Sequence, residues 1–174
     1  CRKETRLASY YKAVRSVFGT RGTRIVALDV LDEQNVNKTI NVIRRFRRAL
    51  RGTPATILGF HNYSDTNRFS TTRTRRVLAA WRGRVWLTET GGIVKFQNFR
   101  YSPSRAAKRT KWMFTLANRY DSRKRGMRSK ITQLFVYRWF GEPRSARFDA
   151  GLVHPNGKPR KAYSVVRKYS KRHR

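Results

Sequence analysis

Residues 84–92 read RVWLTETGG, and this stretch decides how the rest of the chain is interpreted. An apolar run with strand-forming residues ends at a single carboxylate, Glu89, and two glycines follow it. Three other runs share this character: RIVALDVLD at 24–32, TILGFHNYSD at 56–65 and ITQLFVYRWFGEP at 131–143. Short runs rich in β-branched and aromatic residues predict β-strands.

Each predicted strand is followed by a segment with helical periodicity. The four segments are 35–50, 67–81, 102–120 and 158–172. Alternating strands and helices predict a parallel sheet, because parallel neighbours need a long crossover and the helix supplies it. The expected fold class is therefore α/β, and either a (β/α)8 barrel or an open doubly wound sheet satisfies the pattern. No flexible linker divides the chain, so a single domain over residues 1–174 is expected.

Length and composition narrow the possibilities further. A complete eight-stranded β/α barrel usually needs about 250 residues, whereas this chain has 174 and opens at Cys1 beside an amphipathic helical stretch. For a barrel, we expect the chain to begin in mid-domain. Hydrophobic residues make up 39% and aromatic residues 13%, which is enough for a core and excludes a disordered basic tail. No apolar run approaches the roughly 20 residues that span a bilayer.

Several classes of site are absent from the sequence. Cys1 is the single cysteine, so neither an internal disulfide framework nor a thiolate metal site can form. The three histidines, His61, His154 and His173, lack metal-ligand spacing, and no GxGxxG, GxxxxGK[ST], GxSxG or HExxH motif occurs. We therefore expect no metal and no cofactor.

The charge balance is extreme, with 42 Lys and Arg against 9 Asp and Glu and a net charge of +33. Such a field attracts nucleic acids and other polyanions without specificity. The basic clusters are 44–48, 73–76, 123–128 and 168–174. Solvated outer faces of helices explain these clusters. The other hypothesis is a basic nucleic-acid or polyanion-binding module on a β/α scaffold, for which charge is the only evidence.

The alternation of side chains along the strands predicts where a site would lie. Residues two apart share a face of a strand, so Val85, Leu87 and Glu89 are expected on one face. The other three strands also run from small or apolar residues to a polar or aromatic residue at the same spacing. Ligands bind at the carboxyl ends of parallel strands in barrels and doubly wound sheets. The side chains expected at one rim are Asp29, His61, Glu89 and Trp139.

The scarce acidic residues gather at these strand ends. Six of the nine lie at or just beyond them: Asp29, Asp32, Glu33, Asp65, Glu89 and Glu142. Glu89 is the strongest candidate for a catalytic residue, because it ends an apolar strand directly before two glycines. Such a position would suit the nucleophile of a glycosidase, which must be ionised and held rigidly against the anomeric carbon of a sugar. The two glycines after it would let a ligand approach the backbone. The structural alternative is a carboxylate that pairs with an arginine or caps the following segment.

Four other residues are candidates for substrate binding, each with a structural alternative. His61 and Tyr63 could orient the Glu89 carboxylate or bond a sugar hydroxyl, or could simply be satisfied side chains at a strand end. Trp139 suits a sugar-stacking platform, because an indole face matches the apolar face of a pyranose, but it could equally be buried in the core. Asp29 could bind a hydroxyl or cap a loop.

These motifs resemble glycoside hydrolase clan A barrels, and most closely their cellulase-like bacterial members. GFHNYSDTNRFS at 59–70 looks like strand six and WLTETGG at 86–92 like strand seven. YRWFGEP at 137–143, followed by FDAGLVHPNGKPRKAY at 148–163, looks like strand eight. RIVALDVLD would then be strand five, so the resemblance covers nearly the whole chain. It implies a half barrel that contains only strands five to eight with their helices.

The resemblance also implies a mechanism and a substrate class. In this family the glutamate that ends strand seven, the position of Glu89, attacks the sugar in a retaining double displacement. His61, Tyr63 and Trp139 match places where members carry a His or Tyr after strand six and a Trp after strand eight. The family's acid/base glutamate follows an Asn, yet no Asn-Glu dipeptide occurs here. We therefore expect a carbohydrate substrate, an acid/base residue upstream of Cys1, and an incomplete, inactive chain. A secreted protein fits the resemblance, although these residues contain no signal peptide.

Overall fold

A computed structural model describes residues 3–19, 22–97, 99–121, 126 and 128–171. Its main sheet has four parallel strands in the spatial order β1, β2, β3 and β5. Their bounds are Val26–Leu31 for β1, Ile57–His61 for β2, Arg84–Thr90 for β3 and Lys130–Val136 for β5. Each of the four runs predicted to be strands contains one of them, so the α/β class with a parallel sheet is confirmed.

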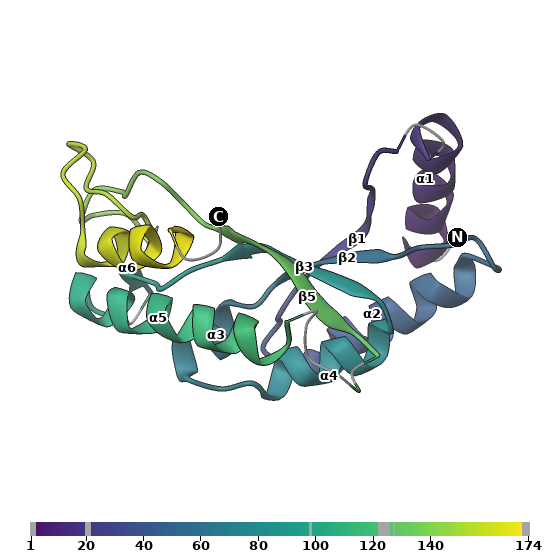
Figure 1. Ribbon diagram of the computed structural model, residues 1–174, viewed down its shortest axis with the longest axis horizontal. Coiled ribbons are helices and arrows are strands. Elements are labelled where there is room, and N and C mark those ends of the chain that lie inside the picture. Colours follow the sequence, from purple (N-terminus) through teal and green to yellow (C-terminus); the bar gives the residue numbers. More distant parts are fainter. Residues whose placement is uncertain (1–2, 20–21, 98, 122–125, 127, 172–174) are drawn as a thin grey trace.

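Six helices accompany the strands in the described residues. They are α1 (Lys3–Phe18), α2 (Val36–Ala49), α3 (Tyr63–Arg68), α4 (Thr72–Trp81), α5 (Pro103–Arg119) and α6 (Lys161–Ser170). Helices α2, α3, α4 and α5 lie together along one side of the sheet, whereas α1 and α6 stand at its two ends (Figure 1). Neighbouring helices pack against each other in the pairs α1 with α2, α2 with α4, and α5 with α6.

Local sequence explains where the long helices begin. The Asn35 side chain accepts a hydrogen bond from the Asn37 amide at 3.0 Å and caps α2. Ser102 accepts from the Arg105 amide at 3.2 Å, with Pro103 in the first helical position of α5. Short polar side chains before a helix satisfy amides that lack a helical partner, and proline is well suited to the first turn.

The core lies between the covered face of the sheet and these helices. Its fully buried members come from the strands and from the inner stripes of the helices: Ile43, Phe46, Leu58, Phe60, Val77, Val85, Leu87 and Leu116. Burial of large apolar side chains at about 25 cal/mol per Å² is the main stabilising contribution to such a layer. The packing therefore orients the opposite face of each strand outward.

The order of the strands distinguishes between a barrel-type sheet and a doubly wound sheet, the two arrangements that the sequence left open. Each strand lies beside its predecessor, and the crossover helices lie on one side of the sheet (Figure 1). A doubly wound sheet would reverse the strand order and place helices on both faces. The arrangement is therefore not doubly wound: it is an α/β fold with a parallel sheet whose crossover helices lie on one side. The described residues form an open sheet rather than a closed barrel.

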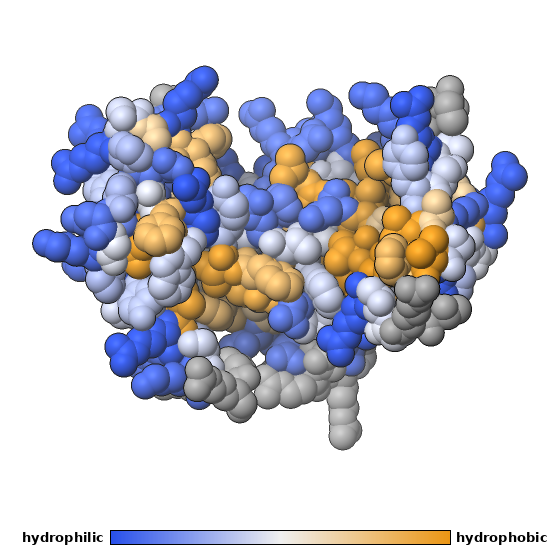
Figure 2. Space-filling view, turned by 90° about the horizontal axis from the view of Figure 1, so that it is seen from above, coloured by the Kyte–Doolittle hydropathy of each residue, from blue (hydrophilic) through white to orange (hydrophobic). Residues whose placement is uncertain are grey.

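The face of the sheet that lacks these helices carries exposed apolar side chains. Viewed from above, hydrophobic groups gather between two hydrophilic flanks (Figure 2). Trp86 of β3 and Phe135 of β5 contact each other with ring centroids 5.9 Å apart. Phe135 is 44% exposed, and Leu31 at the end of β1 is 57% exposed. An apolar surface of this kind usually marks a contact with another element.

A small second sheet is the main feature that the sequence did not reveal. Strands β4 (Lys95–Phe96) and β6 (Phe148–Asp149) pair in antiparallel fashion. Asp149 forms an ion pair with Arg160 at 2.8 Å, and both side chains are 1% exposed. Two-residue strands carry no periodicity, which is why pattern analysis could not find them. Among the described residues, no helix is both long and apolar enough to cross a membrane.

Candidate active site at the carboxyl ends of the strands

Three of the predicted site residues meet at the carboxyl ends of β1, β2 and β3. His61 ends β2, with its Nε2 atom 3.4 Å from Oδ2 of Asp29 on β1. Its Nδ1 atom lies 3.6 Å from Oε2 of Glu89 on β3. The Thr88 hydroxyl donates a hydrogen bond to Oδ1 of Asp29 at 2.8 Å. The imidazole of His61 on β2 thus lies between the carboxylates of Asp29 on β1 and Glu89 on β3, the two strands that flank β2.

The expectation that Val85, Leu87 and Glu89 share one face of β3 is wrong. Val85 and Leu87 are fully buried in the core beneath the helices. The Glu89 side chain instead is 29% exposed and reaches His61. The pairing register of β3 with β5 shifts between Leu87 and Thr90, and its pairing with β2 shifts near the same level. Such a shift breaks the strict alternation of a strand and re-aims a side chain.

The charges around His61 favour its protonated form. The hydrogen bond to Asp29 is the largest influence and raises the pKa of His61, against the opposing effect of burial. The negative charges of Asp29, Glu89 and Asp32 raise it further. Burial on its own would raise the pKa of Asp29, but hydrogen bonds from His61 and Thr88 and the charge of His61 lower it overall. Asp29 and His61 therefore stabilise each other's charged forms.

Tyr63 borders this group from the first turn of α3. Burial and the negative charge of Glu89 both raise the pKa of the Tyr63 hydroxyl. Its ring packs edge-on against Phe148, with centroids 5.8 Å apart, and against Tyr137 at 6.5 Å. Among the described residues, the hydroxyl has no well-aligned hydrogen bond. Tyr63 therefore presents a neutral hydroxyl beside Glu89 from an aromatic wall.

Trp139 packs against the last helix, α6. It follows the end of β5, is 55% exposed, and packs edge-on against Tyr163 of α6 with ring centroids 5.7 Å apart. The structure thus brings together Asp29, His61 and Glu89, with Tyr63 beside them, while the Trp139 ring is exposed and contacts α6.

The glycines after Glu89 have a different role from the one expected. A side chain on Gly91 would meet the Tyr137 carbonyl oxygen at 2.6 Å, and one on Gly92 would overlap the Ala106 carbonyl oxygen. Both glycines are buried. They therefore make room for the protein's own backbone and not for a ligand. Gly59 does serve the site, because a side chain there would overlap the Asp29 carboxylate.

Helix α3 holds the backbone on the far side of Glu89. Asn67 donates to the carbonyl oxygens of Gly91 and Tyr63, each at 2.9 Å, and accepts from the Ile93 amide at 2.8 Å. The hydroxyl oxygens of Thr66 and Thr90 lie 3.1 Å apart in the buried interior. The residues after Glu89 are thus fixed by side chains from a neighbouring crossover. Sequence analysis assigned no such role to Thr66, Asn67 or Thr88.

Asp32 lies next to this group, in the loop after β1. Its carboxylate accepts a hydrogen bond from the Ser64 amide at the start of α3. Burial is the largest influence and, with the charge of Asp65, raises the pKa of Asp32 to about 7 in spite of that hydrogen bond. Within the described residues, no group of three or more His, Cys, Asp or Glu side chains is placed to hold a metal ion.

Comparison with solved structures identifies the architecture. Over 94% of its length the chain superposes on 52% of xylanase 10B from Thermotoga maritima, with a TM-score of 0.57 and 14% identity. Over 91% it matches 56% of a family 17 β-1,3-glucanosyltransferase from Rhizomucor miehei, with a TM-score of 0.61 and 14% identity. Over 92% it matches 53% of a thermostable mutant xylanase from Cellvibrio japonicus, with a TM-score of 0.61 and 14% identity.

The chain shares the fold of clan A-type glycoside hydrolases. The likeness covers most of this chain but only about half the length of each of these enzymes. No known sequence family and no curated protein matches the chain in sequence. The resemblance noted in the sequence is therefore confirmed for the fold.

Proposed function

We propose that this chain is the second half of the catalytic barrel of a retaining glycoside hydrolase, with Glu89 as its nucleophile. The observation that carries the proposal is the position of Glu89 at the carboxyl end of β3, with its carboxylate facing the His61 imidazole, which also contacts Asp29. In this assignment β1, β2, β3 and β5 are barrel strands five to eight.

The charges of the site suit a nucleophile. A carboxylate that attacks an anomeric carbon must be ionised when the sugar arrives. His61 carries a raised pKa and lies 3.6 Å from Glu89. A positive charge on this ring attracts the Glu89 carboxylate and restrains its orientation. Asp29 holds the imidazole from the other side and raises its pKa.

The proposed reaction has two steps. Glu89 attacks the anomeric carbon as the aglycone leaves, and the covalent glycosyl-enzyme intermediate is then hydrolysed by water. Tyr63 would donate its hydroxyl to Glu89 or to a sugar hydroxyl, because its raised pKa keeps the proton in place. Trp139 would stack on a more distant sugar of a poly- or oligosaccharide, since its indole is 55% exposed.

A second carboxyl group is needed to protonate the leaving oxygen. In retaining enzymes the two groups stand about 5 to 5.5 Å apart. Asp29 contacts the other ring nitrogen of His61, and Asp32 accepts a hydrogen bond from the Ser64 amide, so both already have protein partners. We therefore assign the acid/base role to a residue of the other barrel half, which would also cover the open face and the free edges of β1 and β5.

A labelling experiment tests the nucleophile directly. The protein extended by its upstream sequence is treated with a 2-deoxy-2-fluoro glycoside, which traps the covalent intermediate, and the modified peptide is mapped by mass spectrometry. We expect the label on Glu89. The matched control is Glu33→Gln, an exposed acid at a strand end, which should label normally. An active enzyme that is labelled at another carboxylate would disprove the assignment.

A further inference from the structure

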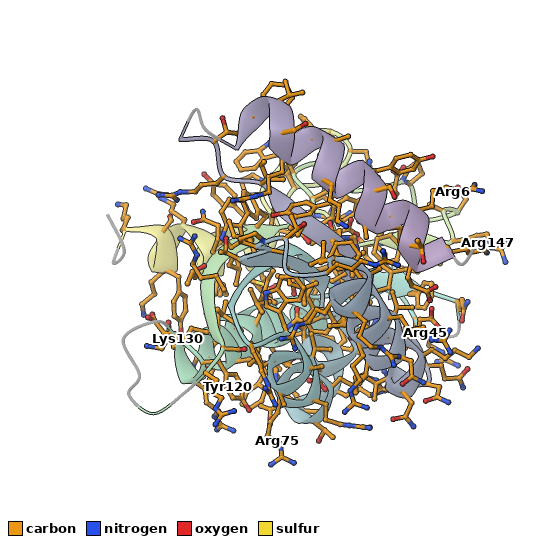
Figure 3. All side chains as sticks on the ribbon, turned by 90° about the vertical axis from the view of Figure 1, so that its right-hand side faces the viewer. Arg6, Arg45, Arg75, Tyr120, Lys130 and Arg147 are labelled. Carbon is orange, nitrogen blue, oxygen red and sulfur yellow. The ribbon has the colours of Figure 1, made fainter. Side chains whose placement is uncertain are left out.

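A strongly basic surface lies at the opposite end of the sheet from Glu89. The last two turns of α2 lead into the amino end of β2, and the turn after α4 leads into the amino end of β3. Six exposed arginines occupy these places. We call them the arginine surface: Arg44, Arg45, Arg47, Arg48, Arg51 and Arg82. Figure 3 looks onto this end, with Arg45 labelled at its outer edge.

The arginine surface is continuous and hollowed. One hollow of about 780 Å³ is lined by Asn41 and by five of the six arginines. A second, of about 490 Å³, adjoins it, shares Arg45 and Arg48, and adds Arg51 and Lys12. A third hollow shares Arg82 with the first and is also lined by Arg75 and Arg128. The arginine side chains therefore line shallow, open depressions.

Few acidic groups offset this charge. Within the described residues, Glu4 is the single carboxylate that pairs with the surface, 3.6 Å from Arg45. Arg44 and Arg48 stand four residues apart on α2, and like charges at that spacing destabilise a helix. A bound polyanion would remove this repulsion, whereas solvent only screens it.

Two members of the surface also occupy an unfavourable backbone conformation. Arg51 has φ 49° and Arg82 has φ 63°, the left-handed region that favours glycine. Arg82 caps the carboxyl end of α4, directly after Trp81, and glycine or asparagine is common in this left-handed position. Arginine at both places adds positive charge to the surface where glycine would suit the backbone better.

We propose that the arginine surface binds the phosphodiester backbone of double-stranded nucleic acid without reading its bases. Guanidinium groups match phosphate oxygens through paired hydrogen bonds. The lining of the two arginine-rich hollows contains no aromatic ring, so the base stacking that supports single-strand binding is missing there. This surface is independent of the proposed hydrolase site, because it lies at the other end of the strands.

The test compares two variants of the full chain that lose the same charge. One replaces Arg44, Arg45, Arg47 and Arg48 with Gln. The control replaces Arg147, Lys158, Arg167 and Lys168, which are also exposed. Binding of a mixed-sequence labelled DNA duplex is measured by fluorescence anisotropy across a salt titration. The first variant should weaken binding at least tenfold and lower the slope of log K against log salt by about 3 to 4, since each phosphate contact contributes about 0.9.

The control variant should change duplex affinity by less than about threefold. Equal losses in both variants would mean that net charge alone attracts DNA, and the proposal would fail. The proposal would also fail if replacement of the four α2 arginines weakened binding to polygalacturonate, or to phosphatidylglycerol vesicles, as much as it weakened binding to the duplex. Arg47 donates a hydrogen bond to the Ala80 carbonyl oxygen at 2.8 Å, and its replacement removes this contact between α2 and α4. Circular dichroism therefore checks that the variant remains folded.

A second variant separates binding from folding. Arg51→Gly with Arg82→Gly relieves two left-handed arginines, so its thermal midpoint should be equal to or above that of the parent. Its duplex affinity should still fall by severalfold. If this variant is as stable as the parent and binds the duplex as tightly, then Arg51 and Arg82 do not contact nucleic acid, and the proposed binding surface does not include them.

Discussion

The Nδ1 atom of His61 lies 3.6 Å from the Oε2 atom of Glu89, across the paired strands β2 and β3. Its other ring nitrogen lies 3.4 Å from Asp29. Protonation of this one ring therefore sets the charge next to the candidate nucleophile. Both the chemistry and the stability of the site should respond to it.

Replacement of Glu89 tests the chemistry. In the protein extended upstream, Glu89→Gln keeps the shape of the side chain but removes the attacking oxygen and its charge. Turnover of an activated aryl glycoside should fall by at least about a thousandfold, while sugar binding largely persists. Glu89→Gly opens space for azide and should then release the inverted glycosyl azide. Near-normal turnover by Glu89→Gln would refute the assignment.

Loss of the His61 ring should change how stability depends on pH. The hydrogen bond to Asp29 raises the pKa of His61 above its ordinary value of 6.5. Its stabilisation is therefore complete below pH 6.5 and is lost as pH rises through the raised pKa. Urea unfolding between pH 5.5 and 9 should show a decline for the parent that His61→Gln lacks. Parallel curves for the two proteins would contradict the ion-pair arrangement.

Asp32 should destabilise the fold when it ionises. Burial raises its pKa to about 7 from 3.8, so the folded state holds the proton more tightly than the unfolded state does. Stability is then greatest below pH 3.8 and falls as pH rises towards 7. Asp32→Asn keeps an acceptor for the Ser64 amide without the charge. We expect it to be more stable than the parent at pH 8, by at most about 4 kcal/mol, and similar at pH 4. If the free energies of unfolding of Asp32→Asn and the parent differed by the same amount at pH 4 and pH 8, ionisation of Asp32 would not be the cause.

Asn67 should support the segment after Glu89. Its amide group makes three hydrogen bonds to backbone atoms of Tyr63, Gly91 and Ile93. Asn67→Ala leaves these groups without that partner and should lower the free energy of unfolding by about 2 to 4 kcal/mol. Asn41→Ala, at an exposed position of α2, is the matched control and should change it by less than about 0.5 kcal/mol. Comparable losses would show that the Asn67 bonds contribute little.

The open face of the sheet should make the isolated chain self-associate. Trp86 and Phe135 contact each other on this face, and Phe135 is 44% exposed. Light scattering should therefore detect dimers or larger species, and Phe135→Gln should reduce them. A monodisperse, highly stable monomer of the 174-residue chain would contradict a sheet that needs covering.

The sequence by itself determined the order and type of the main elements. Runs of β-branched residues ending in a polar side chain predicted the strands, and helical periodicity predicted α2, α4, α5 and α6. These signals are local, because they depend on side-chain period and on caps such as Asn35 and Ser102. The strand-end positions of Asp29, His61 and Glu89 followed from the same patterns.

Only the tertiary structure decided how these residues face one another. The register shift between Leu87 and Thr90 re-aims Glu89, and it depends on pairing with two other strands rather than on the alternation within β3. The roles of Gly91 and Gly92 depend on backbone atoms of Tyr137 and Ala106, which are distant in sequence. Local patterns record the period of a strand, but hydrogen-bond register and close packing are set between segments. For that reason the chain's own residues could name the candidate site without describing its geometry.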